Sequence, residues 1–340
     1  MEIFNTQYPF DKVFVIAEAG SNHNGSLDTA VELVRQAARC KADAIKFQEF
    51  SLESLFSREH YSAVLNLKNR EWERHVRECA FRSEWRETIL REARSNGITY
   101  FSTPFSTEIV DEIDPFVSLY KIASCDITFS QLIKKIASKG KGVFISTGAS
   151  QLEEIDHAVS TLRDFNLPFL CLMHCIMLYP PTPDQLHLNF IQTLKERFGL
   201  PVGFSDHSAG LDAALCAVAK GACAIEKHFT LDKKQEGADH SNSLDPGELR
   251  TLIQKIRLFE QMLGSHERPI SEREVMERVY ARRSLYAARN VKKGKRISED
   301  DLCSLRPNIA VGTEHIDEVI GRKALRDIAR GEPIDLSMIQ

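Results

Sequence analysis

Short apolar runs recur along most of the chain, and each is followed by a longer stretch in which apolar residues have helical spacing. The runs are rich in β-branched and aromatic residues, which is typical of buried strands. Eight strands that each precede a helix predict a (β/α)8 TIM barrel of the α/β class. The predicted strands are Val13–Ala17, Ala42–Phe47, Ile98–Ser102, Ser118–Ile122, Gly142–Ser146, Phe169–Met173, Val202–Phe204 and Ala222–Glu226. The predicted helices include Leu27–Arg39, Ser83–Arg94, Gln131–Ser138, Leu152–Leu162 and Leu211–Lys220.

The pattern changes after Gly264. Residues 265–282 are dense in charge and lack the alternation of strand and helix, which predicts a linker. Residues 283–340 contain short strand-like segments separated by Gly and Pro turns, and this is typical of a compact β-rich module. We therefore expect a barrel over residues 1–264, a linker, and a small second domain that is near the lower size limit for folding alone.

Composition narrows the class of protein. Hydrophobic residues make up 43% and charged residues 27% of the 340 positions, so a large core can form. No apolar run approaches the roughly 20 residues that span a bilayer, and the opening residues lack the pattern of a signal peptide, so we expect a cytoplasmic protein without a membrane partner. The eight cysteines form no CxxC pair, which favours reduced thiols over disulfides or a zinc cluster. A net charge of −4 gives no global basic surface for nucleic acid.

Polar residues gather where the predicted strands end. The active site of a barrel lies at the carboxyl ends of its strands, so polar side chains there carry more weight than elsewhere. Any one of them could be a solvated loop residue, but nine together predict a functional site. The nine are Glu18, Lys46, Gln48, Thr103, Lys121, Ser124, Ser146, His207 and His228.

Two lysines and two histidines in this set suggest particular chemistry. Lys46 and Lys121 end strands with apolar flanks, so they could hold a ligand with carboxylate and phosphate groups, or they could point outward along the barrel wall. His207 and His228 follow the seventh and eighth strands, which are neighbours at about 4.8 Å. They could share a divalent ion, or they could be an ordinary hydrogen-bonded pair.

Ten motifs together resemble the sialic acid synthase family, including its legionaminate and pseudaminate synthase members. They are IAEAGSNHNG, ADAIKFQ, FSTPF, YKIAS, ISTGAS, GFSDHS, IEKHFTLD, GADHSNSLDP, RRSLY and RPN. The resemblance implies a metal-dependent condensation of phosphoenolpyruvate with an amino-sugar aldose, which yields a nine-carbon 2-keto-3-deoxy acid and phosphate. It also implies that the terminal module is the family's antifreeze-like (SAF, β-clip) domain.

The resemblance implies roles for individual residues. The catalytic residues would be Glu18, Lys46, Lys121 and Asp239, with both lysines on phosphoenolpyruvate. The substrate-binding residues would be Gln48, Thr103, Ser124, Ser146, Ser205, His23, Tyr286 and Arg306. The metal ligands would be His207 and His228, with Mn²⁺ preferred and Mg²⁺ or Co²⁺ as alternatives. Glu18 could instead be a structural ion-pair partner, Asp239 a turn residue, and His23 a cap for the helix near Leu27.

Partners and substrate follow from the same resemblance. It implies a homodimer in which the terminal domain closes the barrel of the other subunit, with Tyr286 and Arg306 entering the neighbour's sugar pocket. Ile176 and Met177 stand where the family has polar residues, and the segment Ser51–Phe81 also departs from the family pattern. The acceptor is therefore open between N-acetylmannosamine and a diacetamido-trideoxyhexose.

Two other functions remain open from the sequence. One is another sugar-acid synthase that uses phosphoenolpyruvate, or a barrel aldolase. A phosphorylated acceptor would need an additional cationic cluster, and the sequence shows none. The other is a binding protein without catalytic activity, which the retained lysines and histidines disfavour.

Overall fold

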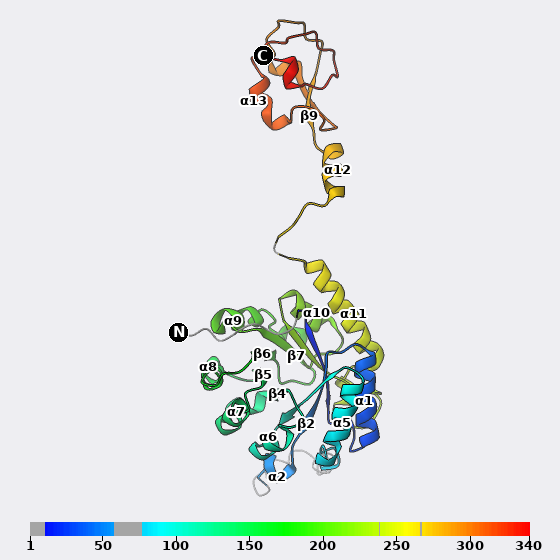
Figure 1. Cartoon of the computed structure of the whole chain (residues 1–340), viewed down its shortest axis with the longest axis vertical. Coiled ribbons are helices and arrows are strands. Elements are labelled where there is room, and N and C mark those ends of the chain that lie inside the picture. The colour runs from blue at the N-terminus through cyan, green and yellow to red at the C-terminus, as the bar shows by residue number, and fades with distance from the viewer. Residues whose placement is uncertain (1–10, 58–76, 238, 266) are drawn as a thin grey trace. The chain divides into compact units, whose positions relative to one another are not determined.

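The computed structural model describes residues 11–57, 77–237, 239–265 and 267–340 (Figure 1). The chain divides into two compact units, Met1–Gly264 and Ser265–Gln340. These are unit 1 and unit 2, respectively.

Unit 1 contains a closed barrel of eight strands in chain order, with the parallel pairing expected for βα repeats. The predicted (β/α)8 fold is confirmed. The strands are β1 (Phe14–Gly20), β2 (Ala44–Glu49), β3 (Thr99–Pro104), β4 (Leu119–Ile122), β5 (Gly142–Ser146), β6 (Leu170–Cys175), β7 (Val202–Asp206) and β8 (Ala224–His228).

Helices surround the barrel (Figure 1). Their bounds are α1 (Leu27–Arg39), α2 (Leu52–Leu55), α5 (Arg86–Ser95), α6 (Thr107–Ile113), α7 (Ser130–Ala137), α8 (Leu152–Arg163), α9 (Phe190–Phe198), α10 (Asp212–Ala219) and α11 (Pro246–Leu263). Helix α1 has the predicted bounds because the side chain of Ser26 accepts a hydrogen bond from the Thr29 amide at its start. Helix α11 begins with a capping box between Asp245 and Glu248. None of the helices in the described part of the chain is long and apolar enough to cross a membrane.

Aromatic and small residues fill the interior of the barrel. The ring of Phe144 stacks on Phe14 at 5.9 Å between centroids and also contacts Phe169 at 5.3 Å. Gly142 is required beside these rings, since a Cβ atom there would lie 2.1 Å from the ring of Phe169. A Cβ at Gly203 would likewise lie 2.5 Å from the Met173 sulfur. Close packing of this kind holds the strand ends in fixed positions.

Several strands extend further toward their carboxyl ends than the apolar runs predicted. Strand β1 continues through Gly20, and β7 and β8 each continue two residues beyond the predicted end, to Asp206 and His228. The pairing register explains the extension, because Glu18 lies beside Lys46 on β2 and beside His228 on β8. Polar residues therefore take part in the barrel hydrogen bonding and are held as rigidly as the core.

Unit 2 has a small core of its own. Strands β9 (Ser284–Ala287) and β10 (Leu302–Leu305) pair antiparallel, and the short helix α13 (Ile316–Val319) follows. Its buried apolar residues are Leu285, Ala287, Val291, Ile297, Val319, Ala324, Ile328, Ile334 and Ile339. The buried Asp301 accepts hydrogen bonds from Arg289 and Lys295, both at 2.6 Å, so a polar cluster also holds this domain together.

The segment predicted as a linker contains a helix, α12 (Glu272–Ala281). Ser271 and Glu274 form a capping box at its start, which explains why a segment dense in charge becomes helical. None of its residues is buried within unit 2. Val275, Met276, Val279 and Tyr280 are all exposed, and their spacing places them on one face.

Candidate active site

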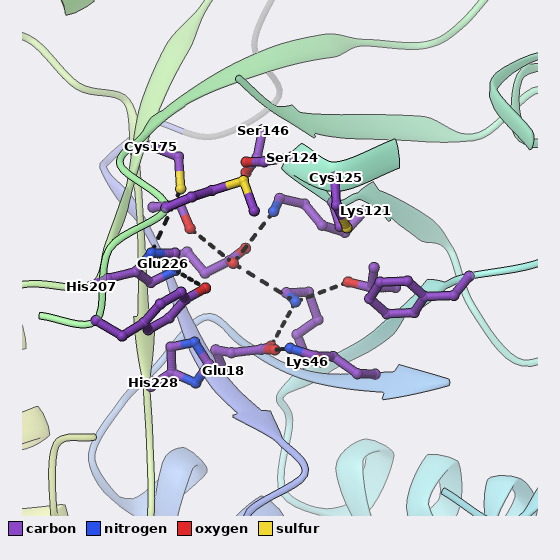
Figure 2. Close-up of a pocket in the computed structure, with 17 residues that line it drawn as sticks. Glu18, Lys46, Lys121, Ser124, Cys125, Ser146, Cys175, His207, Glu226 and His228 are labelled. Atoms are coloured by element: carbon purple, nitrogen blue, oxygen red, sulfur yellow. Dashed lines mark hydrogen bonds and ion pairs between the residues drawn. The ribbon is translucent and has the colours of Figure 1, made fainter. Parts of the chain in front are cut away.

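A cavity of about 210 Å³ opens at the carboxyl ends of the strands, and every strand of the barrel contributes to its wall (Figure 2). The cavity brings together ten residues that the sequence singled out. They are Glu18, Lys46, Gln48, Thr103, Lys121, Ser124, Ser146, Ser205, His207 and His228. The remaining lining residues are Phe105, Ala123, Cys125, Cys175, Met177, Tyr179 and Glu226.

Acidic and basic side chains alternate across the floor of this cavity (Figure 2). Lys46 Nζ lies 2.7 Å from Glu18 Oε2 and 3.7 Å from Glu226 Oε1, while Lys121 Nζ lies 3.4 Å from the same Glu226 oxygen. The side chains of all four residues are at least 93% buried. Gln48 completes the row by donating to Glu18 Oε1 at 2.7 Å. Neither lysine points outward along the barrel wall.

The pairing controls the charge of each group. Burial alone would raise the pKa of Glu226, but Lys121 and Lys46 outweigh burial and lower it to about 2. Burial would likewise lower the pKa of Lys46, but Glu18 and Glu226 outweigh it and raise that pKa above its ordinary value. Glu226 and Lys46 are therefore charged at neutral pH, and Lys46 can bind an anion that enters the cavity.

Hydroxyl groups surround the charged row. Lys46 Nζ donates to Thr103 Oγ1 at 2.9 Å, and Ser205 Oγ donates to Glu226 Oε1 at 3.2 Å. Ser124 Oγ accepts a hydrogen bond from the Gly148 amide at 2.9 Å. Ser146 Oγ is buried without a hydrogen-bond partner in the described chain. Such a group is costly unless a ligand satisfies it.

The two histidines face each other across one side of the cavity. Their ring centroids are 5.5 Å apart. His207 Nδ1 lies 2.8 Å from the carbonyl oxygen of Ile176, and since a carbonyl only accepts, Nδ1 carries the proton and Nε2 keeps its lone pair. Tyr179 donates its hydroxyl proton to that Nε2 at 3.1 Å. Burial, with a contribution from His228, lowers the pKa of His207 to about 3, so the ring is neutral at physiological pH.

The histidines have features that suit a divalent ion. A neutral imidazole whose Nδ1 donates to a backbone carbonyl is the usual arrangement of a metal ligand. His228 Nδ1 is buried without a hydrogen bond from any described residue, and it lies 3.8 Å from Asp239 Oδ2. Across the described residues, no group of three or more His, Cys, Asp or Glu side chains is arranged to hold a metal. A bound ion would thus take further ligands from substrate or water.

A buried ion pair lies directly behind the histidines. Lys227 precedes His228, and its Nζ lies 2.7 Å from Asp206 Oδ2, where Asp206 precedes His207. The same Nζ donates to the Ser208 carbonyl at 2.6 Å. Both charged side chains are almost completely buried. This pair ties the end of β7 to the end of β8, and it thereby fixes the backbone that carries both imidazoles.

Four predicted site residues lie outside the cavity lining. His23 is fully buried against Phe47, Phe81 and Trp85, and its Nδ1 accepts a hydrogen bond from the Gly25 amide. His23 does not cap helix α1, since the side chain of Ser26 does so. Asp239 lies in the loop beside His228. Tyr286 and Arg306 belong to unit 2.

Within unit 2 the two predicted residues differ in exposure. Tyr286 is buried, and its hydroxyl donates to the Pro307 carbonyl at 2.8 Å, whereas Arg306 is exposed. Of the divergent segment Ser51–Phe81, residues 58–76 lie outside the described residues.

Glu226 was not predicted as a site residue, although it lies within the IEKHFT motif. Alternate residues of a strand face the same side, so Glu226 and His228 both point into the barrel while Lys227 points away. That period of two could have identified Glu226 beside His228. Tyr179 had no such signal, because its position depends on how the segment after β6 folds over the cavity, whereas Cys175 is the last residue of β6 itself.

Comparison with known proteins gives consistent matches. A model of the NeuB family matches residues 33–268, and a model of the SAF domain matches residues 282–340. The N,N'-diacetyllegionaminic acid synthase of Legionella pneumophila is 37% identical over 94% of this chain and 92% of that protein. The pseudaminic acid synthase of Campylobacter jejuni is 35% identical over 97% of both chains. A crystal structure of N-acetylneuraminic acid synthetase from Leptospira borgpetersenii, in complex with citrate, is 34% identical with a TM-score of 0.71 and covers 78% of this chain and 90% of that one.

Proposed function

The chain belongs to the NeuB family and ends in a SAF domain, and we propose that it condenses phosphoenolpyruvate with an N-acetylated amino-sugar aldose. The products would be a nine-carbon 2-keto-3-deoxy acid and inorganic phosphate. The observation that carries the proposal is the cavity in which Lys46 and Lys121, each beside a glutamate, share the lining with His207 and His228.

Phosphoenolpyruvate carries a carboxylate and a phosphate, and the cavity offers complementary groups. Lys46 and Lys121 would bind its anionic oxygens. To do so, each lysine would move away from the glutamate with which it now forms an ion pair. The hydroxyls of Ser124 and Ser146 would complete the contacts, since Ser146 Oγ has no hydrogen-bond partner among the described residues. Binding would satisfy the buried Ser146 hydroxyl and offset the cost of separating the ion pairs.

The bond changes follow from the electron-rich C3 of phosphoenolpyruvate. C3 attacks the aldehyde carbon of the open-chain sugar, a C–C bond forms, and the aldehyde oxygen takes a proton to become a hydroxyl. Positive charge develops at C2, where Glu18 and Glu226 would stabilise it. Water adds to C2 and loses a proton, and the resulting tetrahedral carbon expels phosphate to leave the ketone.

His207 and His228 would hold the divalent ion, for which we propose Mn²⁺, and the ion would supply Lewis acidity toward the sugar aldehyde. The protein's own part is to keep the His207 ring neutral and to orient both rings. The Ile176 carbonyl fixes the tautomer of His207, and the pair of Lys227 and Asp206 fixes the backbone of both histidines. Asp239, beside His228, would orient that ring or a water molecule.

For the acceptor we propose a diacetamido-trideoxyhexose. Met177 lines the cavity and offers an apolar contact to the methyl group of a 6-deoxy sugar, where N-acetylmannosamine carries a hydroxyl. Among the described residues that line the cavity, Lys46 and Lys121 are the only lysines or arginines, which disfavours a phosphorylated acceptor. The variant Met177→Asn should shift the ratio of kcat/KM values toward N-acetylmannosamine. An unchanged ratio would show that Met177 does not select the sugar.

The decisive experiment measures phosphate release from phosphoenolpyruvate with a panel of N-acetylated hexoses, with and without Mn²⁺. Phosphate should appear only with an acceptor and a divalent ion, and exhaustive chelation should abolish it. His207→Ala should lose bound metal by elemental analysis. If chelation left the rate unchanged, or if His207→Ala kept full metal occupancy, the metal assignment would be wrong. If no acceptor in the panel released phosphate, the proposed reaction would be wrong.

We further propose that the enzyme is a homodimer in which unit 2 closes the barrel of the partner subunit. A cationic intermediate needs controlled access of water, which an open barrel mouth does not provide. The exposed apolar face of α12 would pack against the second copy, and Arg306 would enter its cavity. Tyr286 would act indirectly, since its bond to the Pro307 carbonyl holds the backbone next to Arg306.

Mixing two inactive variants tests the shared site. His207→Ala impairs the barrel and spares unit 2, while Arg306→Ala does the reverse. After random exchange about half of the dimers are mixed, and each mixed dimer has one intact site, so activity should return to about a quarter of wild type. Absence of recovery despite demonstrated exchange would exclude a shared site.

A further inference from the structure

Unit 1 contains a second cavity, of about 530 Å³, that the proposed reaction does not use. Lys12 lies just before β1 and Lys41 lies between α1 and β2, so the cavity is at the amino ends of the strands, opposite the active site. Helix α11 forms its other wall. The lining residues are Lys12, Arg39, Cys40, Lys41, Arg250, Ile253, Gln254, Arg257, Leu258 and Gln261.

The charge of this lining is one-sided. Five of the ten lining residues are Lys or Arg, and none of the ten is acidic. The carboxylates nearby, Asp43 and Glu260, are not among the lining residues. Asp43 pairs with Lys12 at 3.1 Å and with Arg257 at 2.8 Å. Arg257 also contacts Glu260 at 3.0 Å.

Two of the cations carry uncompensated charge. Lys41 and Arg250 have no ion pair with any described residue, and Arg39 only approaches Glu32, at 3.7 Å. The whole chain has a net charge of −4, so this local excess of positive charge does not reflect the overall composition. A concave surface lined by one sign of charge attracts and concentrates ions of the opposite sign.

We propose that this cavity binds a nucleotide. Arg and Lys side chains that converge on a concave surface suit a phosphate group, because guanidinium forms two parallel hydrogen bonds to phosphate oxygens. Ile253, Leu258 and the aliphatic stems of the basic residues give the same cavity an apolar wall that suits a base or sugar. The volume is within the range of small-molecule sites.

The site is connected to the barrel strand that carries Glu18. Arg257 Nη1 donates to the Val13 carbonyl at 2.9 Å, and Asp43 Oδ2 accepts from the Val15 amide at 2.9 Å. A phosphate that draws Arg257 or Lys12 away from Asp43 changes the contacts of the segment that starts β1. Occupancy should therefore also change the rate of phosphate release, which makes the site a regulatory one.

Calorimetric titration of the full-length protein with AMP, CMP, GMP, UMP and inorganic phosphate tests the proposal. We expect one nucleotide site per chain, and weaker binding of inorganic phosphate because it leaves the apolar wall uncovered. Lys41→Glu combined with Arg250→Glu should weaken the binding at least about a hundredfold, because two charged hydrogen bonds are replaced by repulsion. Neither residue contacts the active-site cavity, so the variant should retain phosphate release in the absence of nucleotide.

Two further variants make the result specific. Lys134→Glu combined with Lys220→Glu makes the same charge change at exposed positions outside the cavity, and it should bind nucleotide like wild type. Lys46→Ala combined with Lys121→Ala removes the cations of the active site, and it should also bind normally. Loss of binding in this last variant, with retention in Lys41→Glu/Arg250→Glu, would place the nucleotide in the active site and overturn the proposal. Absence of nucleotide binding to wild type, or equal affinity for inorganic phosphate, would also overturn it.

Discussion

Replacement of Lys227 by Met tests whether the buried pair with Asp206 holds the ends of β7 and β8. Met preserves most of the aliphatic length of the side chain, so the change removes charge and hydrogen bonds more than volume. After the substitution, Asp206 keeps a hydrogen bond from the Ser208 amide at 2.8 Å and loses its buried cation. The Ser208 carbonyl loses its bond from the lysine.

The magnitude follows from the burial of the pair. The Lys227 side chain is 1% exposed and that of Asp206 is 0% exposed, so water cannot solvate the carboxylate that remains. Removal of one partner from such a pair costs about 3–5 kcal/mol of the free energy of unfolding. For a domain of this size the Tm should fall by about 6–20 °C. Because His207 and His228 adjoin the pair, metal affinity should fall as well.

Chemical denaturation and thermal melts measure the loss of stability. Lys220→Met is the matched control, because Lys220 is exposed and its replacement should change the free energy of unfolding by less than about 0.5 kcal/mol. The double variant Asp206→Leu/Lys227→Met removes the uncompensated charge and should recover most of the stability without restoring metal affinity. A loss below about 1 kcal/mol in Lys227→Met, or a double variant as unstable as the single one, would refute the reasoning.

Three other predictions concern single groups. Lys46→Ala and Lys121→Ala should each weaken phosphoenolpyruvate binding at least about tenfold, since a charged hydrogen bond contributes about 1.5–3 kcal/mol. Titration of each variant with phosphoenolpyruvate measures the change. Wild-type affinity in both variants would contradict the proposed contacts. Burial raises the pKa of Asp126 to about 6. Ionised Asp126 therefore lowers the free energy of unfolding, and this loss grows as the pH rises from the pKa of Asp126 in the unfolded chain to about 6. Asp126→Asn should therefore raise the Tm more at about pH 7.5 than at about pH 4, and an equal gain at both would argue against a buried, uncompensated carboxylate. Burial lowers the pKa of His23 to about 4. The free energy of unfolding should therefore fall as the pH drops from about 6.5 to 4. His23→Leu should flatten this part of the profile of Tm against pH.

Some features of the active site were accessible from the sequence because they depend on local pattern. Apolar runs located all eight strands, and the polar residues at or just beyond the ends of those runs include Lys46, Lys121, His207 and His228, which line the cavity. The strand period of two would also have identified Glu226 beside His228. Helix α12 was not predicted, because the charge density of its segment is typical of a linker, whereas the capping box at Ser271 starts a helix there.

Other features depend on which residues from distant parts of the chain become neighbours. Lys46 could have faced solvent, and only closure of the barrel places it between Glu18 on β1 and Glu226 on β8. His23 belongs to a motif near the site, yet packing against Trp85 holds it outside the cavity.

The sequence by itself determined the order of strands and helices and the chemical types of residue at the carboxyl ends of the strands, because both follow from short-range periodicity. Only the tertiary structure decided which charges pair, which nitrogen of His207 carries its proton, and which hydroxyls of the described residues are buried without a partner. The basic cavity is of the second kind, since it joins Lys41 near the start of the chain to Arg250, more than two hundred residues later. Electrostatic energy and burial depend on distance in space, and the folded barrel sets those distances.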